Sequence, residues 1–262
     1  MARDVVVPVD PTRPPTLAVS VAAVVARQAG LGVDIVTAPP HGSPRADLSA
    51  RAGEARATGA PRVHAEVLGT TSDPAAAITD RARRPDAAMV CMATGARGPV
   101  CEIVLGSVSA AVVRSSRVPV LLVGPNVDRF GPRVERVVAS ADGSELSAGA
   151  LPVASDLASS LFAELVLVRV VADEGTEDGD AAHFDYLHGL ASRYPGQPVQ
   201  VDVLHDDDPA RAIAGYAGGR GDTVVAMATH GRGALGRLAL GSVAMTVAHT
   251  AACPVLVVPR RD

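Results

Sequence analysis

The sequence predicts an α/β protein made of two tandem domains, each an open parallel sheet with helices on both faces. Two observations lead to this fold class. Val- and Leu-rich apolar runs alternate with helical segments, and the chain repeats itself at an offset of 135 residues. Such apolar runs suit parallel strands covered on both faces, and repeated strand–helix–strand units give a doubly wound sheet. The predicted fold is therefore Rossmann-like or flavodoxin-like.

The repeat is clearest in the second part of each copy. Shifted by 135 residues, MATGARGPVCEIVLGSV (92–108) falls on MATHGRGALGRLALGSV (227–243), with nine of 17 positions identical and no gap. Such self-similarity indicates a duplicated domain. We expect a first domain over 1–125 and a second over 134–262, joined by the Pro- and Gly-bearing stretch 124–133.

Individual elements are easiest to assign in the second copy. Strands are predicted at its Val/Leu-rich runs, 135–141, 164–171, 199–204, 223–228 and 255–258. Helices are predicted between them, at 145–160, 182–193, 209–219 and 242–251. Asp73-Pro74 and Asp208-Pro209 are typical of helix starts, an N-cap acid followed by proline in the first turn. The acidic run that ends at Asp208 is therefore interpreted as a helix entry rather than a metal site.

Composition excludes several classes of function. A net charge of −4 without a basic cluster, and only six aromatic residues, argue against a nucleic-acid surface. All 24 basic residues are Arg, so neither a Walker A lysine nor a Schiff-base lysine exists. No apolar run approaches the ~18 residues of a membrane span, and the first residues do not read as a signal peptide. We expect a cytoplasmic protein with neither nucleic acid nor membrane as a partner.

The three cysteines form an odd set without C-x-x-C spacing, which predicts a reduced protein without disulfides or structural zinc. Cys91 and Cys253 lie in or beside apolar strands and are expected to fill the core. Cys101 lies in a loop, where a redox role is the alternative to an ordinary exposed thiol.

One stretch, ATHGRGALGRLALGS (228–242), contains G-x-G-x-x-G, the pattern of dinucleotide-binding sites. That fingerprint belongs between the first strand and first helix of a βαβ unit, with an acidic residue about 20 positions further on. Here the pattern lies near the end of a copy, and Leu256 stands where the acid is required. A dinucleotide enzyme is therefore disfavoured.

The same stretch could hold phosphate in another way, because ligands of open α/β sheets bind beyond the carboxyl ends of the strands. Asp142 follows the first strand of the second copy, and the glycine-rich loop leads to a helix start at Gly241-Ser242. A helix N-terminus binds phosphate through unpaired N–H groups without lysine. Gly231 permits close backbone approach and Arg232 could neutralise phosphate charge. Ordinary loop glycines and an N-cap serine remain the alternative interpretation.

The tail MATHGRGALGRLALGSVAMTVAHTAACPVLVVP (227–259) resembles the signature of universal stress proteins, whose nucleotide loop is G-x2-G-x9-G-[S/T]. VVASADGSELS (137–147) resembles their first strand and turn, and the resemblance covers the whole chain as two tandem domains. It implies five-stranded domains with strand order 3-2-1-4-5. It also implies binding of ATP, ADP or AMP, with Mg²⁺ as an optional companion. Because members commonly pair through the last strand, 118–123 and 253–258 are expected to pair within this chain.

Carried over by position, the resemblance implies a set of nucleotide contacts in the second domain. Asp142 and Val170 would contact adenine and ribose. The loop and phosphate contacts would be Met227, Ala228, His230, Gly231, Arg232, Gly241, Ser242, Val243 and Ala244. His230 is interpreted as a ligand contact rather than a base, since no Ser or Cys nucleophile with an acid partner is readable beside it. No catalytic residue is predicted.

Both copies depart from the family motif. Ala228 occupies the first motif glycine of the second copy, and in the first copy both leading glycines are alanines, Ala93 and Ala96. The first copy keeps Gly106-Ser107 at its helix start, and it keeps the strand-end carboxylate of Asp10. We expect the first site to bind nucleotide more weakly than the second.

The function expected from this resemblance is an adenine-nucleotide-binding regulatory module of the stress response. Two alternatives remain: a nucleotide-free interaction protein of the same fold, and a slow ATP hydrolase. The expected partner is an adenine nucleotide, and a homodimer through the domain surfaces is compatible with the sequence.

Overall fold

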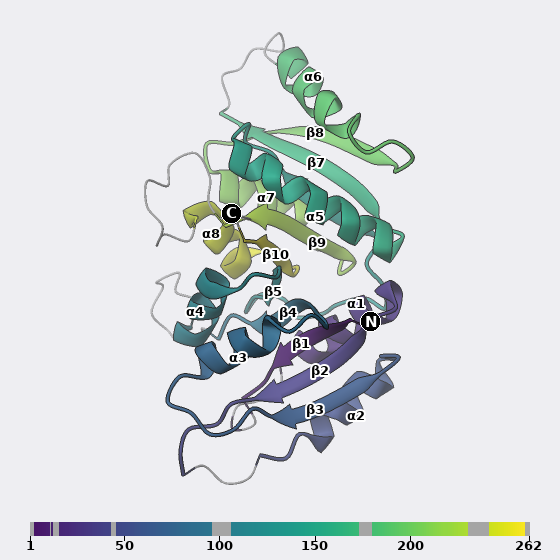
Figure 1. Ribbon diagram of the computed structural model, residues 1–262. Coiled ribbons are helices and arrows are strands. Elements are labelled where there is room, and N and C mark those ends of the chain that lie inside the picture. Colours follow the sequence, from purple (N-terminus) through teal and green to yellow (C-terminus); the bar gives the residue numbers. More distant parts are fainter. Residues whose placement is uncertain are drawn as a thin grey trace.

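A single ten-stranded sheet forms the centre of the molecule, with strand order β3-β2-β1-β4-β5-β10-β9-β6-β7-β8 (Figure 1). The computed structural model describes residues 3–10, 12, 16–42, 46–95, 106–172, 180–229 and 241–259. Each half of the sheet has the order 3-2-1-4-5, and pairing within each half is parallel. The predicted α/β class and strand order are confirmed.

The first half contributes five strands and four helices to the described residues. Its strands are β1 (Asp4–Pro8), β2 (Gly32–Thr37), β3 (Val63–Val67), β4 (Ala87–Ala93) and β5 (Val120–Val123). Its helices are α1 (Ala18–Ala29), α2 (Ser49–Ala57), α3 (Pro74–Ala82) and α4 (Ser107–Ser115).

The second half repeats this succession of elements. Its strands are β6 (Arg136–Ser140), β7 (Glu164–Val171), β8 (Val199–His205), β9 (Thr223–Ala228) and β10 (Val255–Val258). Its helices are α5 (Glu145–Leu161), α6 (Asp180–Ala191), α7 (Pro209–Ala217) and α8 (Ser242–Thr250). Every element predicted for this copy is present, with ends within two residues of the expected ones.

Alternate residues of the strands feed two apolar cores, one on each face of the sheet. Val5 and Val7 face a core formed with α1, α2, α5 and α6, whereas Val6 faces a core formed with α3, α4, α7 and α8. The sheet twists along its length, so α5 lies in front of it in the upper half of Figure 1 and α3 lies in front in the lower half. Both cores are continuous across the two halves of the chain.

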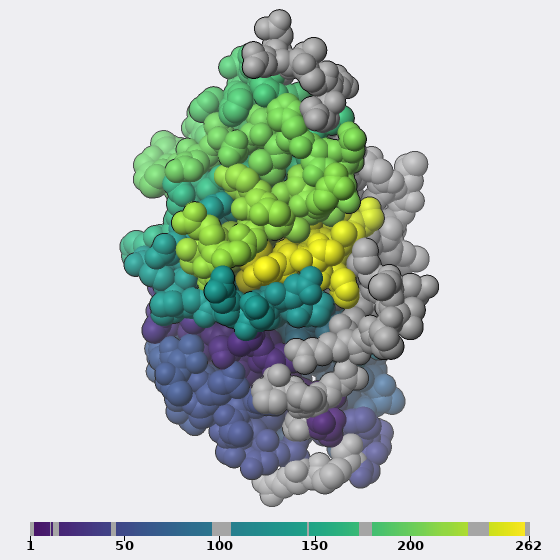
Figure 2. Space-filling view, turned by 180° about the vertical axis from the view of Figure 1, so that it is seen from behind, coloured from purple at the N-terminus to yellow at the C-terminus, as the bar shows by residue number. Residues whose placement is uncertain are grey.

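The halves join through their last strands. β5 and β10 are antiparallel, with Leu122 opposite Val255 and Val120 opposite Val257. In Figure 2 the yellow C-terminal segment lies between the green second half and a teal segment of the first. Alone, each strand would leave an apolar edge open to solvent. The predicted pairing of these strands is confirmed.

A second connection between the halves comes from Gln28 in α1. Its Nε2 donates to the carbonyl oxygens of Val134 and Leu161, at 3.1 and 2.9 Å, and its Oε1 accepts from the Val134 amide at 2.6 Å. One side chain thus satisfies backbone groups at the start of the second half and at the end of α5. The two halves form one packed unit.

Helix ends follow the local sequence. Asp73 accepts a hydrogen bond from the Ala76 amide, and Asp208 accepts from the amide of Arg211 two positions after Pro209, so both predicted helix entries are confirmed. Cys91 and Cys253 are buried and unbridged, as expected for core residues. Within the described ranges, none of the helices has the length and apolar character needed to cross a membrane.

Candidate functional site

The candidate site lies at the carboxyl ends of β6 and β9, two neighbouring parallel strands in the second domain. From β6 the chain proceeds to β7 on one side, while β9 is followed by β10 on the other. The strand order therefore reverses between β6 and β9. Open α/β sheets bind ligands at this kind of reversal point.

Asp142 stands at the end of β6, held by its local turn. The Ala141 amide donates to the Val168 carbonyl at 2.8 Å, which fixes the strand end against β7. The Asp142 carboxylate accepts from the Ser144 amide at 2.8 Å, and Gly143 between them has φ 85°. The half-buried Asp142 is thereby held just beyond the carboxyl end of β6, beside β7.

The start of α8 is held by the end of β9. The Thr229 amide donates to the Val258 carbonyl at 3.2 Å, and the Thr229 carbonyl accepts from the Gly241 amide. Gly241 is the N-cap of α8 and has no side chain to cap the helix. By contrast, Ser144 caps α5 and Asp208 caps α7 in the same domain. The first-turn amides of α8 therefore lack a side-chain cap from their N-cap residue, which favours an anion there.

The remaining predicted contacts fall around these two features or outside the described residues. Val170 lies half-buried in β7 opposite Leu204 of β8. At the end of β9, Met227 is buried and Ala228 half-buried. In the first turn of α8, burial increases along the chain, from exposed Ser242 through Val243 to buried Ala244. His230, Gly231 and Arg232 lie outside the described residues.

The first domain keeps the backbone framework of this site. The Thr94 amide donates to Val123 at 3.1 Å, and Gly106, the N-cap of α4, donates to the Thr94 carbonyl at 2.8 Å. These are the counterparts of the bonds at Thr229 and Gly241, and Ser107 begins α4 in an exposed position. At the end of the first strand, the exposed Asp10 accepts from the Thr12 amide at 2.9 Å.

Sequence reasoning missed a difference between the two helix starts. Ser109 in α4 is buried, and its hydroxyl donates to the carbonyls of Thr94 and Gly106 at 3.0 and 2.9 Å. The 135-residue offset places Ala244 at this position in α8, where no such bond can form. The replacement of Ser109 by Ala244 is visible when the two copies are compared at this offset, and it could have indicated the difference.

A pair of charged residues stands near the carboxyl end of β8. Arg211 holds the Asp206 carboxylate through two hydrogen bonds, at 2.5 and 3.0 Å, and the Asp208 amide donates to it at 2.7 Å. These bonds, that from the Arg211 side chain first, lower the pKa of Asp206 below its ordinary value. The pair fixes the entry to α7 on the same edge of the sheet as Asp142.

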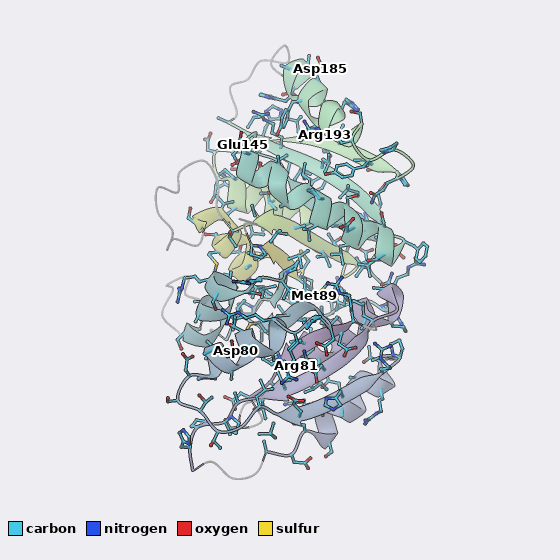
Figure 3. The ribbon with its side chains drawn as sticks, viewed as in Figure 1. Asp80, Arg81, Met89, Glu145, Asp185 and Arg193 are labelled. Carbon is cyan, nitrogen blue, oxygen red and sulfur yellow. The ribbon has the colours of Figure 1, made fainter. Side chains whose placement is uncertain are left out.

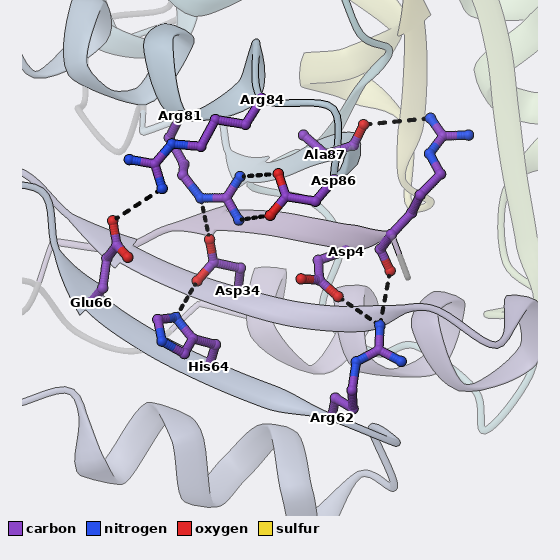
Figure 4. Close-up of polar contacts among 10 residues, drawn as sticks. Asp4, Asp34, Arg62, His64, Glu66, Arg81, Arg84, Asp86 and Ala87 are labelled. Carbon is purple, nitrogen blue, oxygen red and sulfur yellow. Dashed lines mark hydrogen bonds and ion pairs between the residues drawn. The ribbon is translucent and has the colours of Figure 1, made fainter. Parts of the chain in front are cut away.

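A second charged cluster, also missed from sequence, lies toward the amino ends of the first domain's strands (Figure 4). Asp34 in β2 is fully buried, and Arg81 from α3 pairs with it at 2.6 Å. The two terminal nitrogens of Arg81 also bind both oxygens of Asp86, at 3.0 and 3.1 Å. His64 approaches Asp34 at 3.1 Å from the edge strand β3.

This cluster is separate from the candidate site. In Figure 3, Arg81 lies in the lower half of the molecule, whereas Glu145, which follows the Ser144 cap of α5, lies in the upper half. The charged groups around Arg81 are ion-paired with one another, which indicates a structural role. In the parts of the chain that the structure describes, no three His, Cys, Asp or Glu side chains gather as metal ligands.

Comparison with known proteins agrees with the fold and with the repeat. The model of the Universal stress protein family matches residues 1–124 and again 133–259. The universal stress protein Rv2005c of Mycobacterium tuberculosis H37Rv is 30% identical over 185 residues, which are 66% of this chain but only 62% of that relative. Rv2623 of the same strain is 28% identical over 213 residues, 76% of this chain and 69% of the relative.

Two solved structures are similar along nearly the whole chain. A universal stress protein from Archaeoglobus fulgidus DSM 4304 has a TM-score of 0.67 at 20% identity and covers 98% of both chains. A Pseudomonas aeruginosa PAO1 protein of unknown function has a TM-score of 0.71 at 19% identity, covering 98% of this chain and 92% of the other. At these identities the likeness concerns the fold alone. Because the family model matches both halves, the chain belongs to the universal stress protein family.

Proposed function

We propose that the second domain binds an adenine nucleotide, ATP, ADP or AMP, and that the protein is a cytoplasmic, nucleotide-responsive regulatory module of the stress response. One observation carries this proposal. The first-turn amides of α8 follow a glycine N-cap at the point where the strand order reverses. α8 begins beyond the end of β9, whose neighbour β6 leads to Asp142, and the next strand, β7, carries Val170.

Each part of this arrangement suits one part of a nucleotide. The amides of Ser242, Val243 and Ala244, at the positive end of the α8 dipole, suit phosphate oxygens. A carboxylate such as Asp142 suits hydroxyl donors of a ribose. Val170 offers an apolar surface to the base. Mg²⁺ would enter with ATP, held by phosphate oxygens and water, as is usual for this ion.

The two domains should differ in affinity. Ala96 replaces the glycine equivalent to Gly231 in the first copy, and a β-carbon costs about 1–2 kcal/mol if that position needs a left-handed backbone. That cost corresponds to about a tenfold loss of affinity or more. The sequence predicts no general base for the attacking water, so hydrolysis of bound ATP should be slow.

Calorimetric titration of ATP into wild type, Gly241→Val and Gly106→Val tests the proposal. We expect Gly241→Val to abolish the tighter binding phase, because the side chain stands at the phosphate-binding helix start. Gly106→Val should leave that phase nearly intact, although its β-carbon would lie 3.2 Å from the Thr94 carbonyl. Thermal melts confirm that both variants fold. Equal loss in both variants would contradict unequal sites, and no heat from wild type would favour a nucleotide-free interaction protein.

A further inference from the structure

Helix α8 reaches from the proposed nucleotide site to the first domain. It begins after Gly241, at the proposed phosphate position, and its last turn meets the segment that follows β5. The Asn126 side chain donates to the Thr250 carbonyl at 3.0 Å. Gly124, immediately after β5, lies against the Ala248 carbonyl. One helix therefore has its start in one domain's candidate site and its end against the segment that leaves the last strand of the other domain.

The contact at Gly124 leaves no room for a side chain. A β-carbon built on Gly124 would lie 2.3 Å from the Ala248 carbonyl oxygen and 3.4 Å from its carbon. The Gly124 backbone is itself fixed, since its carbonyl accepts from the Val127 amide and the preceding Val123 carbonyl accepts from Thr94. Gly124 is buried, as is Val127. The fixed backbone at Gly124 thus limits how far the end of α8 can move toward β5.

α8 is short and well packed, so it should move as a unit. Its nine residues span about 13 Å at the usual rise of 1.5 Å per residue. Val247 and Ala248 are buried in the core that α8 shares with α7 and β10. A shift of about 1 Å imposed on its last turn would be passed to its first-turn amides, because packed elements transmit strain.

We infer that α8 is a strut through which the first domain sets the nucleotide affinity of the second. This inference rests on the proposed function of the second domain. The contact of Gly124 and Asn126 with the end of α8 holds the amides of residues 242–244 in register with the end of β9. Any change in the first domain that moves the end of β5 alters phosphate binding in the second, without a ligand contact of its own.

Gly124→Ala tests the strut, because Gly124 is not among the proposed ligand contacts. The alanine β-carbon must displace the Ala248 carbonyl by about 1 Å, and misaligned hydrogen bonds to phosphate should weaken ATP binding about tenfold. Gly149→Ala in α5 is the matched control, since nothing lies within 4 Å of its β-carbon. That variant should bind ATP as wild type does.

Asn126→Ala is an independent probe that removes the bond to Thr250 without a clash, and about a threefold loss of ATP affinity is expected. ATP affinities come from calorimetry, and circular dichroism melts report folding. Wild-type affinity in a folded Gly124→Ala protein would overturn the strut while leaving the proposed function intact. If Gly124→Ala does not fold, Asn126→Ala decides, and unchanged affinity there overturns the inference. Absence of ATP binding by wild type would instead overturn the proposed function.

Discussion

Phe162 occupies a backbone conformation that glycine usually takes, and replacing it should stabilise the protein. It ends α5 with φ 51° and ψ 38°, and among the described residues it is the one non-glycine residue with positive φ. In the first copy the corresponding helix, α1, ends at Gly30 with φ 66° and ψ 24°. The two copies thus end the equivalent helix in the same left-handed conformation, one with glycine and the other with phenylalanine.

The expected gain follows from the local geometry. The left-handed conformation costs a non-glycine residue about 1–2 kcal/mol. Phe162 is 86% exposed, so removal of its side chain loses little packing. Glycine itself destabilises the folded state by about 0.5–1 kcal/mol, because it raises the entropy of the unfolded chain, and this offsets part of the gain. Phe162→Gly should therefore stabilise by about 0.5–1 kcal/mol, a rise in Tm of about 1–3 °C for a chain of this size.

Gly30→Ala is the reciprocal change. Nothing lies within 4 Å of a β-carbon there, so the effect comes from the backbone conformation alone. We expect a fall in Tm of similar size. Differential scanning calorimetry of the two variants beside wild type measures both shifts. A lower Tm for Phe162→Gly, or an unchanged Tm for Gly30→Ala, would refute the reasoning from the left-handed cap.

Three further outcomes are expected. Arg81→Met should lower the free energy of unfolding, measured in urea, by about 3–5 kcal/mol, because it leaves the buried Asp34 carboxylate without its arginine partner. Adding Asp34→Val, the residue found at the corresponding position 166 of the second copy, should recover most of that loss. Burial raises the pKa of Cys91 above its usual range and that of Cys253 to about 12, so a Cys101→Ser variant should react with a thiol reagent only after denaturation; rapid reaction in the native state would contradict this. The pKa of Asp206 is lowered from its ordinary 3.8 by the hydrogen bonds from Arg211 and the Asp208 amide, so its stabilising contribution is present above that pH and is lost as the pH falls through the lower folded value. The Tm difference between wild type and Asp206→Asn should therefore shrink below pH 3.8, and a constant difference would count against the Arg211 pair.

Fold class and duplication could be predicted from sequence because they depend on periodic features. Runs such as 164–171 are long and apolar, and the Asp-Pro helix starts carry their own capping chemistry. The pairing of β5 with β10 was expected from the family resemblance together with the pattern, since two short apolar last strands need a partner. These signals are local in the chain or repeat at a fixed offset.

The charged cluster and the contacts that Gln28 and Gly124 make between the domains could not be predicted, because they join residues distant in sequence. Asp34 and Arg81 lie 47 positions apart, and nothing near Asp34 in the chain announces a buried carboxylate. Gln28 bonds to Val134 across 106 positions. The close approach of Gly124 to Ala248 depends on how the halves dock. Such contacts arise from tertiary packing and leave no periodic trace.

The most direct test of nucleotide binding at α8 is a titration of ¹⁵N-labelled protein with ATP, followed through the backbone amide resonances. If phosphates bind as proposed, the amides of Ser242, Val243 and Ala244 show the largest chemical-shift changes, because they donate to the added charge. The counterparts at residues 107–109 should shift less, and only at higher ATP concentration. Shifts confined to other parts of the chain, such as the Asp34 cluster, or no shifts at all, would contradict a nucleotide site at the start of α8.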